Sequence, residues 1–301
     1  MTPLQRYIAE EIATDHADGL IGRREALRRL GMLGVGATAA VALLAACSSS
    51  GDQANSASTA SKPAASSAPP GTSGAIPATA ITFAGPGGRQ LQAAWAAAPQ
   101  PRGSVLVIHE NKGLTDHIRS VTGRFAGAGY SALAVDLLSE LGGTAAFTDP
   151  AAATAELGKI APDQFIADLQ AGIAELERRV PGKKIGATGF CFGGGLVWML
   201  LATGTPKLAA ATPFYGPFPQ NGELSGSKAA VLGIYAAKDE RVIASRPTAE
   251  AALDRAGLVH EIYVAPNADH AFFNDTGPRY NPTAAAEAWQ RVLNWYGTYL
   301  G

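Results

Sequence analysis

The sequence predicts an α/β domain with a mostly parallel central sheet and helices on both faces. Two observations predict this fold class. From residue 90 to residue 300, short apolar runs typical of buried strands alternate with segments of helical periodicity. Residues 76–301 are also numerous enough to bury one sizeable hydrophobic core. Strands that alternate with helices usually run parallel and are covered on both faces.

The strands are predicted from short apolar and β-branched runs that lie between turn residues. The first run follows the turn Gly85-Pro86-Gly87-Gly88, and the fourth follows Pro181-Gly182. In chain order we expect strands at residues 90–97, 104–109, 131–135, 183–188, 208–215, 229–235 and 259–264.

The helices are predicted from apolar residues that recur at helical spacing, such as those from Phe165 to Leu176. Pro247 at the start of one segment and Gly257 after its end are typical of helix boundaries. We expect helices at residues 118–128, 163–180, 196–202, 247–256 and 282–300.

The turn between the fourth strand and the next helix carries the motif Gly189-Phe190-Cys191-Phe192-Gly193-Gly194. A nucleophile at such a turn needs a strained backbone and small neighbours, which Gly189 and Gly193 provide. The motif predicts a nucleophile elbow with a thiol in place of the usual serine. At a helix N-terminus Cys191 is favoured as the thiolate, and the N–H of Phe192 points toward an oxyanion. The alternative is a buried structural cysteine.

Residues 1–47 are predicted to be an export signal. They contain the pair Arg23-Arg24 and an apolar stretch from Leu30 to Ala46, and Leu44-Ala45-Ala46-Cys47 resembles a bacterial lipoprotein cleavage box. We therefore expect lipidation of Cys47 and export to the cell envelope or periplasm with a lipid anchor. The arginine pair resembles a Tat signal, while the Sec route stays open because position 26 is Ala rather than Phe. An uncleaved membrane anchor is the alternative, although the apolar stretch is short for a transmembrane helix.

Residues 48–75 consist almost wholly of Ser, Ala, Gly, Pro and Thr, which predicts a disordered tether before the domain at 76–301. The net charge of −1 and the lack of a basic cluster outside the signal argue against a nucleic acid partner. The chain has two cysteines, Cys47 and Cys191. If the first is lipidated, the second has no intramolecular disulfide partner, which favours a chemical role for Cys191.

A thiol nucleophile with a histidine base needs an acid that orients the imidazole, and in such sheets these residues follow the C-terminal ends of strands. Asp239 follows the strand at 229–235, and His270 follows the last strand. The order of nucleophile, acid and histidine along the chain is that of the α/β-hydrolase fold. His109 also ends a strand and is the competing base, whereas Glu240 and Asp269 are the competing acids.

The segment from His109 to Gly113 occupies the place where α/β-hydrolases keep the second oxyanion loop. We expect the backbone N–H of Asn111 to bind an oxyanion together with that of Phe192. Glu110 is predicted to accept a hydrogen bond from the resting thiol and so to regulate it. The alternative is a loop glutamate that pairs with Lys112 in solvent.

These segments resemble the dienelactone hydrolase (carboxymethylenebutenolidase) family, and the resemblance covers about residues 88–299. The matching residues are His109-Glu110-Asn111-Lys112-Gly113, Val135-Asp136-Leu137-Leu138, Gly189-Phe190-Cys191-Phe192-Gly193-Gly194, Phe214-Tyr215-Gly216, Asp239 and Ala268-Asp269-His270-Ala271-Phe272. Cysteine in the elbow together with Glu110 distinguishes this family from serine esterases. The resemblance implies a carboxylic ester hydrolase in which Cys191, Asp239 and His270 form a triad and open a small ester or lactone through an acyl-enzyme.

The expected substrate pocket includes Tyr215, Phe272 and Asn274, and one of these positions departs from the resemblance. Family members that act on dienelactone hold its carboxylate with arginines, one of them four residues after the catalytic histidine. That position is Asn274 here, and a neutral amide does not replace a charge-assisted fork. We therefore expect an uncharged or differently charged ester or lactone as the substrate.

No metal or organic cofactor is expected, because the histidines and carboxylates lack ligand spacing such as H-E-x-x-H. The expected partner is a small-molecule substrate, the membrane is reached only through the signal or lipid, and the domain is expected to be a monomer. Two other functions stay open. The same triad could serve a thioesterase or acyltransferase, and a tethered binding protein could keep the scaffold without turnover.

Overall fold

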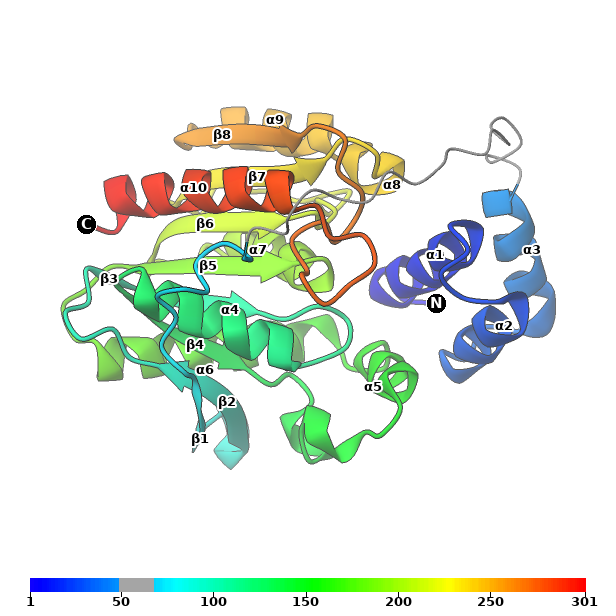
Figure 1. Cartoon of the computed structure of the whole chain (residues 1–301), viewed down its shortest axis with the longest axis horizontal. Helices are drawn as coiled ribbons and strands as arrows, with labels where there is room; N and C mark the ends of the chain where they lie inside the picture. The colour runs from blue at the N-terminus through cyan, green and yellow to red at the C-terminus, as the bar shows by residue number, and fades with distance from the viewer. Residues whose placement is uncertain (49–67) are drawn as a thin grey trace. The chain divides into compact units, whose positions relative to one another are not determined.

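A computed structural model of the chain describes residues 1–48 and 68–301, which divide into two compact units (Figure 1). The smaller unit consists of Met1–Ser66 with Ala145–Pro162, and the larger unit of Ser67–Thr144 with Asp163–Gly301. Most of the predicted tether, residues 49–67, lies outside the described residues. Among the residues described, no helix is both long and apolar enough to span a membrane.

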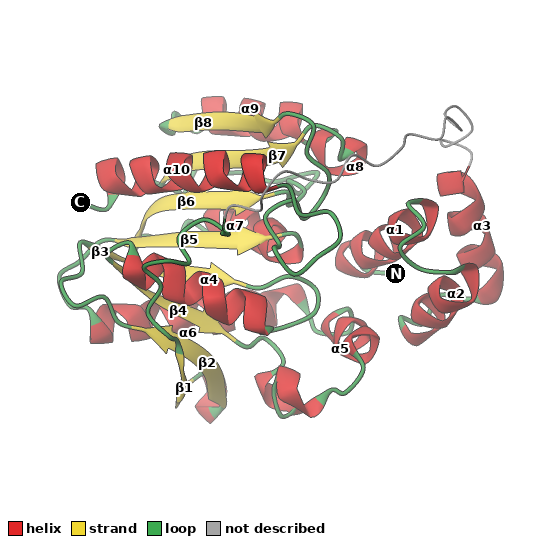
Figure 2. Cartoon of the chain, viewed as in Figure 1, coloured by secondary structure: helices red, strands yellow, loops and turns green. Residues whose placement is uncertain are grey.

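The larger unit is built on one eight-stranded sheet in the order β1-β2-β4-β3-β5-β6-β7-β8 (Figure 2). β2 pairs antiparallel with both β1 and β4, and the other neighbouring strands of the described sheet pair in parallel. The predicted mostly parallel sheet is therefore confirmed. The strands are β1 (Thr79–Ala84), β2 (Gln90–Ala96), β3 (Gly103–Ile108), β4 (Tyr130–Val135), β5 (Ile185–Phe190), β6 (Leu208–Phe214), β7 (Ala230–Ala236) and β8 (His260–Ala265).

Helices cover both faces of this sheet, as predicted. The helices are α4 (Asp116–Gly127), α6 (Pro162–Arg179), α7 (Phe192–Ala202), α8 (Glu240–Ile243), α9 (Arg246–Arg255) and α10 (Pro282–Tyr299). α4 and α10 lie on the face nearer the viewer in Figure 1, and α6, α7 and α9 lie on the opposite face. The ring of Phe125 on α4 lies 4.8 Å from that of Trp289 and 6.0 Å from that of Tyr296, both on α10. The core therefore forms two apolar layers, one on each side of the buried central strands.

Every predicted strand and helix of the larger unit is present. The largest boundary error is at α7, which begins at Phe192 rather than at residue 196. Consecutive glycines predict a loop because glycine is a poor helix former, but here they lie in the first turn of the helix. β1 and α8 were not predicted from the sequence. β1 is an edge strand with mostly exposed side chains, so it has no buried apolar run to mark it.

The chain packs on the larger unit slightly before the predicted domain start at Ile76. The N–H of Ile76 donates a 3.0 Å hydrogen bond to the carbonyl of Gly123 on α4. A Cβ built on Gly127 would lie 1.9 Å from the carbonyl oxygen of Gly74. The last residues of the segment predicted as a tether therefore lie against α4.

In its described residues the smaller unit is a group of four α-helices drawn from two distant parts of the sequence. They are α1 (Pro3–Ala17), α2 (Arg23–Met32), α3 (Ala37–Ser48) and α5 (Pro150–Leu157). Ile8, Leu30 and Leu33 are buried in its core. A Cβ built on Gly158, just after α5, would lie 2.7 Å from Leu33 Cδ2. The C-terminal end of α5 therefore packs closely on the N-terminal helices.

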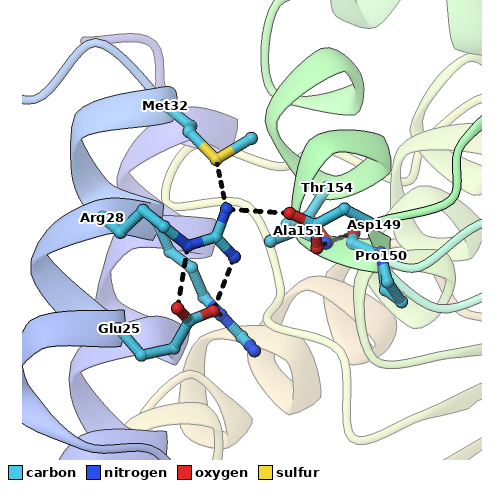
Figure 3. A network of polar contacts seen from close by, with 8 residues as sticks. Glu25, Arg28, Met32, Asp149, Pro150, Ala151 and Thr154 are labelled. Atoms are coloured by element: carbon cyan, nitrogen blue, oxygen red, sulfur yellow. Dashed lines mark hydrogen bonds and ion pairs between the residues drawn. The ribbon is translucent and has the colours of Figure 1, made fainter.

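Arg28 joins two helices of this unit through hydrogen bonds and ion pairs (Figure 3). Its guanidinium donates to both carboxylate oxygens of Glu25, at 2.7 and 2.8 Å, and to Asp149 Oδ2 at 2.8 Å. The other oxygen of Asp149 caps α5 by accepting from the N–H of Ala151 at 2.9 Å. Hydrogen bonds from Arg28 and Arg29 lower the pKa of Glu25 to about 2. Asp149 thus begins α5 and links it to α2.

Candidate active site

Cys191 lies at the sharp turn between β5 and α7, in a backbone conformation that side chains rarely adopt. Its φ is 57° and its ψ is −118°, and it occupies the N-cap position of α7. A Cβ built on Gly189 would lie 2.1 Å from the carbonyl oxygen of Gly193, and one built on Gly193 would lie 2.4 Å from that of Ile108. Any larger residue at either position would displace the backbone. The steric reason given for the two glycines is therefore confirmed.

The loop after β3 runs beside the N-terminus of α7. The hypothetical Cβ of Gly193 would also lie 2.6 Å from the carbonyl oxygen of His109, which places the start of this loop against the elbow. Asn111 follows two residues later. The structure therefore brings the two predicted oxyanion segments together, and the binding of an oxyanion by the N–H groups of Asn111 and Phe192 stays a prediction.

His270 and Asp239 meet at the ends of the two strands from which they were predicted. Nδ1 of His270 lies 2.5 Å from Oδ2 of Asp239, and both side chains are buried. A ring nitrogen of His270 lies within 4.8 Å of the Sγ of Cys191. Oδ1 of Asp239 accepts a 3.2 Å hydrogen bond from the N–H of Val242 at the start of α8. Asp239 therefore both caps a helix and orients the histidine.

The competing residues have other environments. His109 is completely buried, its Nδ1 lies 2.7 Å from the carbonyl oxygen of Glu110, and its Nε2 accepts from the N–H of Leu137 at 3.2 Å. Both ring nitrogens are thus bound to the backbone, and burial lowers the pKa of His109. Glu240 is exposed, and Asp269 lies 3.6 Å from Lys238 at the surface. The contact of Asp239 with His270 therefore favours Asp239 as the acid.

Glu110 is buried rather than exposed beside Lys112. Its side chain accepts a 2.6 Å hydrogen bond at Oε2 from the amide nitrogen of Asn274. The second oxygen, Oε1, is buried and accepts no hydrogen bond from the described residues. The amide oxygen of Asn274 accepts from both the backbone N–H and the hydroxyl of Thr276, at 3.0 and 2.7 Å. Asn274 therefore connects Glu110 to the turn that follows His270.

The ring of Tyr215 packs against the imidazole of His270, and the ring of Phe272 packs against Tyr215. Tyr215 follows β6 with a φ of 34°, and its ring centroid lies 5.2 Å from that of His270. The ring of Phe272 lies 5.4 Å from that of Tyr215, and both residues are fully buried. Tyr215 thus contacts the imidazole edge to face, while the role of the two rings as pocket walls stays a prediction.

Comparison with known proteins identifies the family. A family model described as "Dienelactone hydrolase family" matches residues 91–300. The chain belongs to the dienelactone hydrolase family. It is accordingly a carboxylic ester hydrolase of the α/β-hydrolase superfamily.

Several relatives of the dienelactone hydrolase family are similar over most of their own length. A "Putative carboxymethylenebutenolidase" of Salmonella typhi is 35% identical over 211 residues, which is 65% of this chain and 77% of the relative. One of Saccharolobus solfataricus is 32% identical over 240 residues, which is 68% of this chain and 93% of the relative. The crystal structure of a "Putative Dienelactone Hydrolase" from Klebsiella pneumoniae is 32% identical with a TM-score of 0.64, and the match covers 74% of this chain and 99% of that one. A dienelactone hydrolase-like promiscuous phosphotriesterase from metagenomic libraries is 26% identical with a TM-score of 0.66, and the match covers 76% and 100% of the two chains.

One group of residues beside this dienelactone hydrolase site was not predicted from the sequence. Asp275 contacts His117 and Arg124 through both of its carboxylate oxygens. Asp275 comes five residues after His270 and His117 comes seven after Glu110, so sequence proximity to two predicted site residues was the available signal. The contact itself joins segments 158 positions apart, and no local pattern reveals such a pairing.

Proposed function

We propose that the chain hydrolyses a small ester or lactone by acyl transfer to Cys191. The observation that carries this proposal is the arrangement of three side chains from three strand ends. Cys191 occupies a strained turn, a ring nitrogen of His270 lies within 4.8 Å of its Sγ, and Asp239 lies 2.5 Å from Nδ1 of the same ring. This arrangement supports the roles of nucleophile, base and orienting acid in a hydrolase triad.

In the first step His270 accepts the thiol proton, and the Cys191 sulfur forms a bond to the substrate carbonyl carbon. The carbonyl oxygen becomes an oxyanion that accepts hydrogen bonds from the backbone N–H groups of Phe192 and Asn111. When the C–O bond to the leaving group breaks, His270 returns its proton to the departing oxygen. Water then attacks the thioester with His270 as base, the carbon–sulfur bond breaks, and the acid is released. Asp239 holds the imidazole in place through both steps.

The substrate is proposed to be uncharged near the reacting carbonyl. Dienelactone carries a carboxylate, whereas Asn274 offers an amide, and that amide is already bound to Glu110. Glu110 itself is an acidic side chain buried at this site. A second carboxylate would have to enter beside it with an amide rather than an arginine at position 274, which is unfavourable in a buried environment. Neutral esters and lactones avoid this cost.

Steady-state kinetics on neutral esters, neutral lactones, thioesters, dienelactone and a neutral phosphotriester test both parts of the proposal. The phosphotriester is included because a structural relative is described as a promiscuous phosphotriesterase. We expect turnover of a neutral ester or lactone with trapping of an acyl group on Cys191, and loss of at least about a thousandfold in Cys191→Ala. Undiminished ester hydrolysis in Cys191→Ala would refute the nucleophile. Transfer of the acyl group to an acceptor other than water would instead indicate an acyltransferase.

Asn274→Arg is the matched variant for substrate charge. An arginine at this position provides a charge-assisted fork for a carboxylate, so the ratio of kcat/KM for dienelactone to that for a neutral lactone is expected to rise about tenfold or more. Efficient dienelactone turnover by the unaltered enzyme would overturn the proposed preference for uncharged substrates.

We also propose that residues 1–47 direct export and that Cys47 is lipidated. The exposed side chains of Arg23 and Arg24 and the cleavage-box residues before Cys47 support this proposal. Mass spectrometry of protein expressed in a bacterial host tests it. We expect a lipid-modified N-terminus at Cys47 that is absent in Cys47→Ser, and an unprocessed chain in the cytoplasm would contradict the proposal.

A further inference from the structure

Asp275, His117 and Arg124 form a buried charged cluster next to the active site. Oδ1 of Asp275 lies 2.6 Å from Nδ1 of His117, and Oδ2 lies 2.6 Å from Nη2 of Arg124. The side chains of His117 and Arg124 are only 1% and 2% exposed. Arg124 also donates through Nε to the hydroxyl of Ser120 at 3.1 Å. Two polar atoms of the cluster, Nε2 of His117 and Nη1 of Arg124, are buried and have no hydrogen-bond partner among the described residues.

Stability alone does not account for such a cluster. Burying an arginine and an aspartate removes both from water, and well-packed apolar residues in the same space are often at least as stable. Burial by itself would raise the pKa of Asp275, but the hydrogen bond from His117 and the charge of Arg124 lower it to about 2. The carboxylate is therefore charged at neutral pH and is held in one orientation by two donors of fixed geometry.

The cluster connects the two loops that carry the acidic residue and the base of the site. His117 lies in the first turn of α4, which directly follows the loop of Glu110 and Asn111. Asp275 follows Asn274 on the loop after His270. The same two segments are joined a second time by the hydrogen bond from Asn274 to Glu110. Two neighbouring residues of the loop after His270 thus bind the loop of Glu110 and the helix that follows it.

We propose that Asp275 is a positioning residue that holds the loop after His270 on α4, so that Asn274 presents its amide to Glu110. In this arrangement Oε2 of Glu110 stays bound to Asn274, and the buried carboxylate does not turn toward solvent. Asp275 acts through Asn274 and does not contact the substrate. The inference rests on the proposed role of Cys191 as nucleophile.

The test compares Asp275→Asn, Asn274→Ala and the double variant. The two readouts are kcat/KM on a neutral ester and the pH dependence of Cys191 alkylation by iodoacetamide. If Asp275 acts through Asn274, each single variant lowers kcat/KM about tenfold to a hundredfold and shifts the alkylation profile in the same direction. The double variant is then no worse than Asn274→Ala. Multiplied losses in the double variant would overturn the proposal.

Asp168→Asn is the matched control for loss of a buried ion pair. Asp168 lies 2.7 Å from Nη2 of Arg89, and its side chain is 3% exposed, but it lies on α6 on the opposite face of the sheet from α4. The Asp168→Asn substitution is expected to leave the pH dependence of Cys191 alkylation unchanged. If Asp275→Asn is folded and behaves like Asp168→Asn in both readouts, Asp275 is structural only.

His117→Leu provides a second route if Asp275→Asn does not fold. It removes one of the two donors to Asp275 and leaves Arg124 in place. The same shift in the alkylation profile is expected, with recovery in His117→Asn, whose amide nitrogen can replace Nδ1. An unshifted profile in His117→Leu overturns the proposal, and so does a shift that His117→Asn does not reverse. Undiminished ester hydrolysis in Cys191→Ala would instead refute the proposed nucleophile, so the two failures are distinguishable.

Discussion

At the scale of single residues, Asp239 uses its two oxygens for different partners. One accepts from the backbone at the start of α8, and the other faces the imidazole of His270. A turn aspartate and a catalytic acid are the alternatives for this position, and the carboxylate makes the contact that each of them requires. The helix cap fixes the carboxylate, which in turn fixes the ring.

Asp239→Asn separates these two roles. Asparagine is as good a helix cap as aspartate, so the midpoint of thermal unfolding should change little. Its amide nitrogen would donate to Nδ1 rather than accept from it, which stabilises the wrong tautomer of His270 and should lower kcat about a thousandfold or more. Calorimetry and steady-state kinetics measure the two effects. A large drop in thermal stability with nearly normal kcat would contradict the assignment.

The residues of the site were predictable where a local rule applied to them. Gly189 and Gly193 reveal the elbow because no other residue fits, and Asp239 and His270 follow strands whose ends meet at one edge of the sheet. The partner of Asn274 was not predictable in the same way. The hydrogen bond from Asn274 to Glu110 spans 164 positions, and only the folded chain brings the two together.

At the scale of elements, a buried carboxylate joins α6 to the turn between β1 and β2. Asp168 on α6 lies 2.7 Å from Arg89, which also lies 2.7 Å from Glu140. Burial raises the pKa of Asp168 to about 6 although the charge of Arg89 acts in the opposite direction. The folded state therefore binds a proton at Asp168 more tightly than the unfolded chain does.

This raised pKa predicts the sign of a pH effect on stability. The contribution of Asp168 is fully present below its ordinary pKa of 3.8 and is lost as the pH rises through about 6. Between pH 4 and pH 7 the free energy of unfolding of the wild type should fall relative to Asp168→Asn, by an amount on the order of 2 to 3 kcal/mol. Urea titrations of both proteins across this range measure the difference. A difference independent of pH would show that Asp168 keeps an ordinary pKa.

The elements that the sequence does not predict are those whose packing partners are few or lie far away in the sequence. α5 is alanine-rich and has no apolar stripe of its own, and its burial comes from helices more than a hundred positions earlier. β1 pairs on one side only and exposes most of its side chains. The periodic spacing of apolar residues indicates which face of a segment is buried against the core. It therefore identifies the central strands and the long helices.

At the scale of the whole molecule, α5 belongs to the smaller unit although it is inserted between β4 and α6. Its packing partners are the helices of residues 1–48, the region predicted to be an export signal. Removal of that region would leave α5 without its apolar neighbours and without the ion pair from Arg28 to Asp149. The rest of the larger unit would keep its own core.

Limited proteolysis of the full chain and of a chain beginning at residue 68 tests this expectation. Cleavage within residues 145–162 should be at least about tenfold faster in the shorter chain, because local opening follows the number of buried contacts. Arg28→Ala is the matched point variant, and it should have little effect because its ion pair is exposed and such pairs contribute little. Equal cleavage rates in the two chains would show that α5 is held by other contacts.

Cys191, the single cysteine of residues 68–301, also determines how oxidation inactivates the enzyme. Its side chain is 3% exposed, so large oxidants reach the sulfur slowly. Residues 68–301 contain no second cysteine, and a sulfenic acid formed at Cys191 therefore has no neighbouring thiol with which to close a protective disulfide. Further oxidation leads to sulfinic acid, which thiols do not reverse. Inactivation by oxidation of Cys191 is therefore permanent once it has passed the first step.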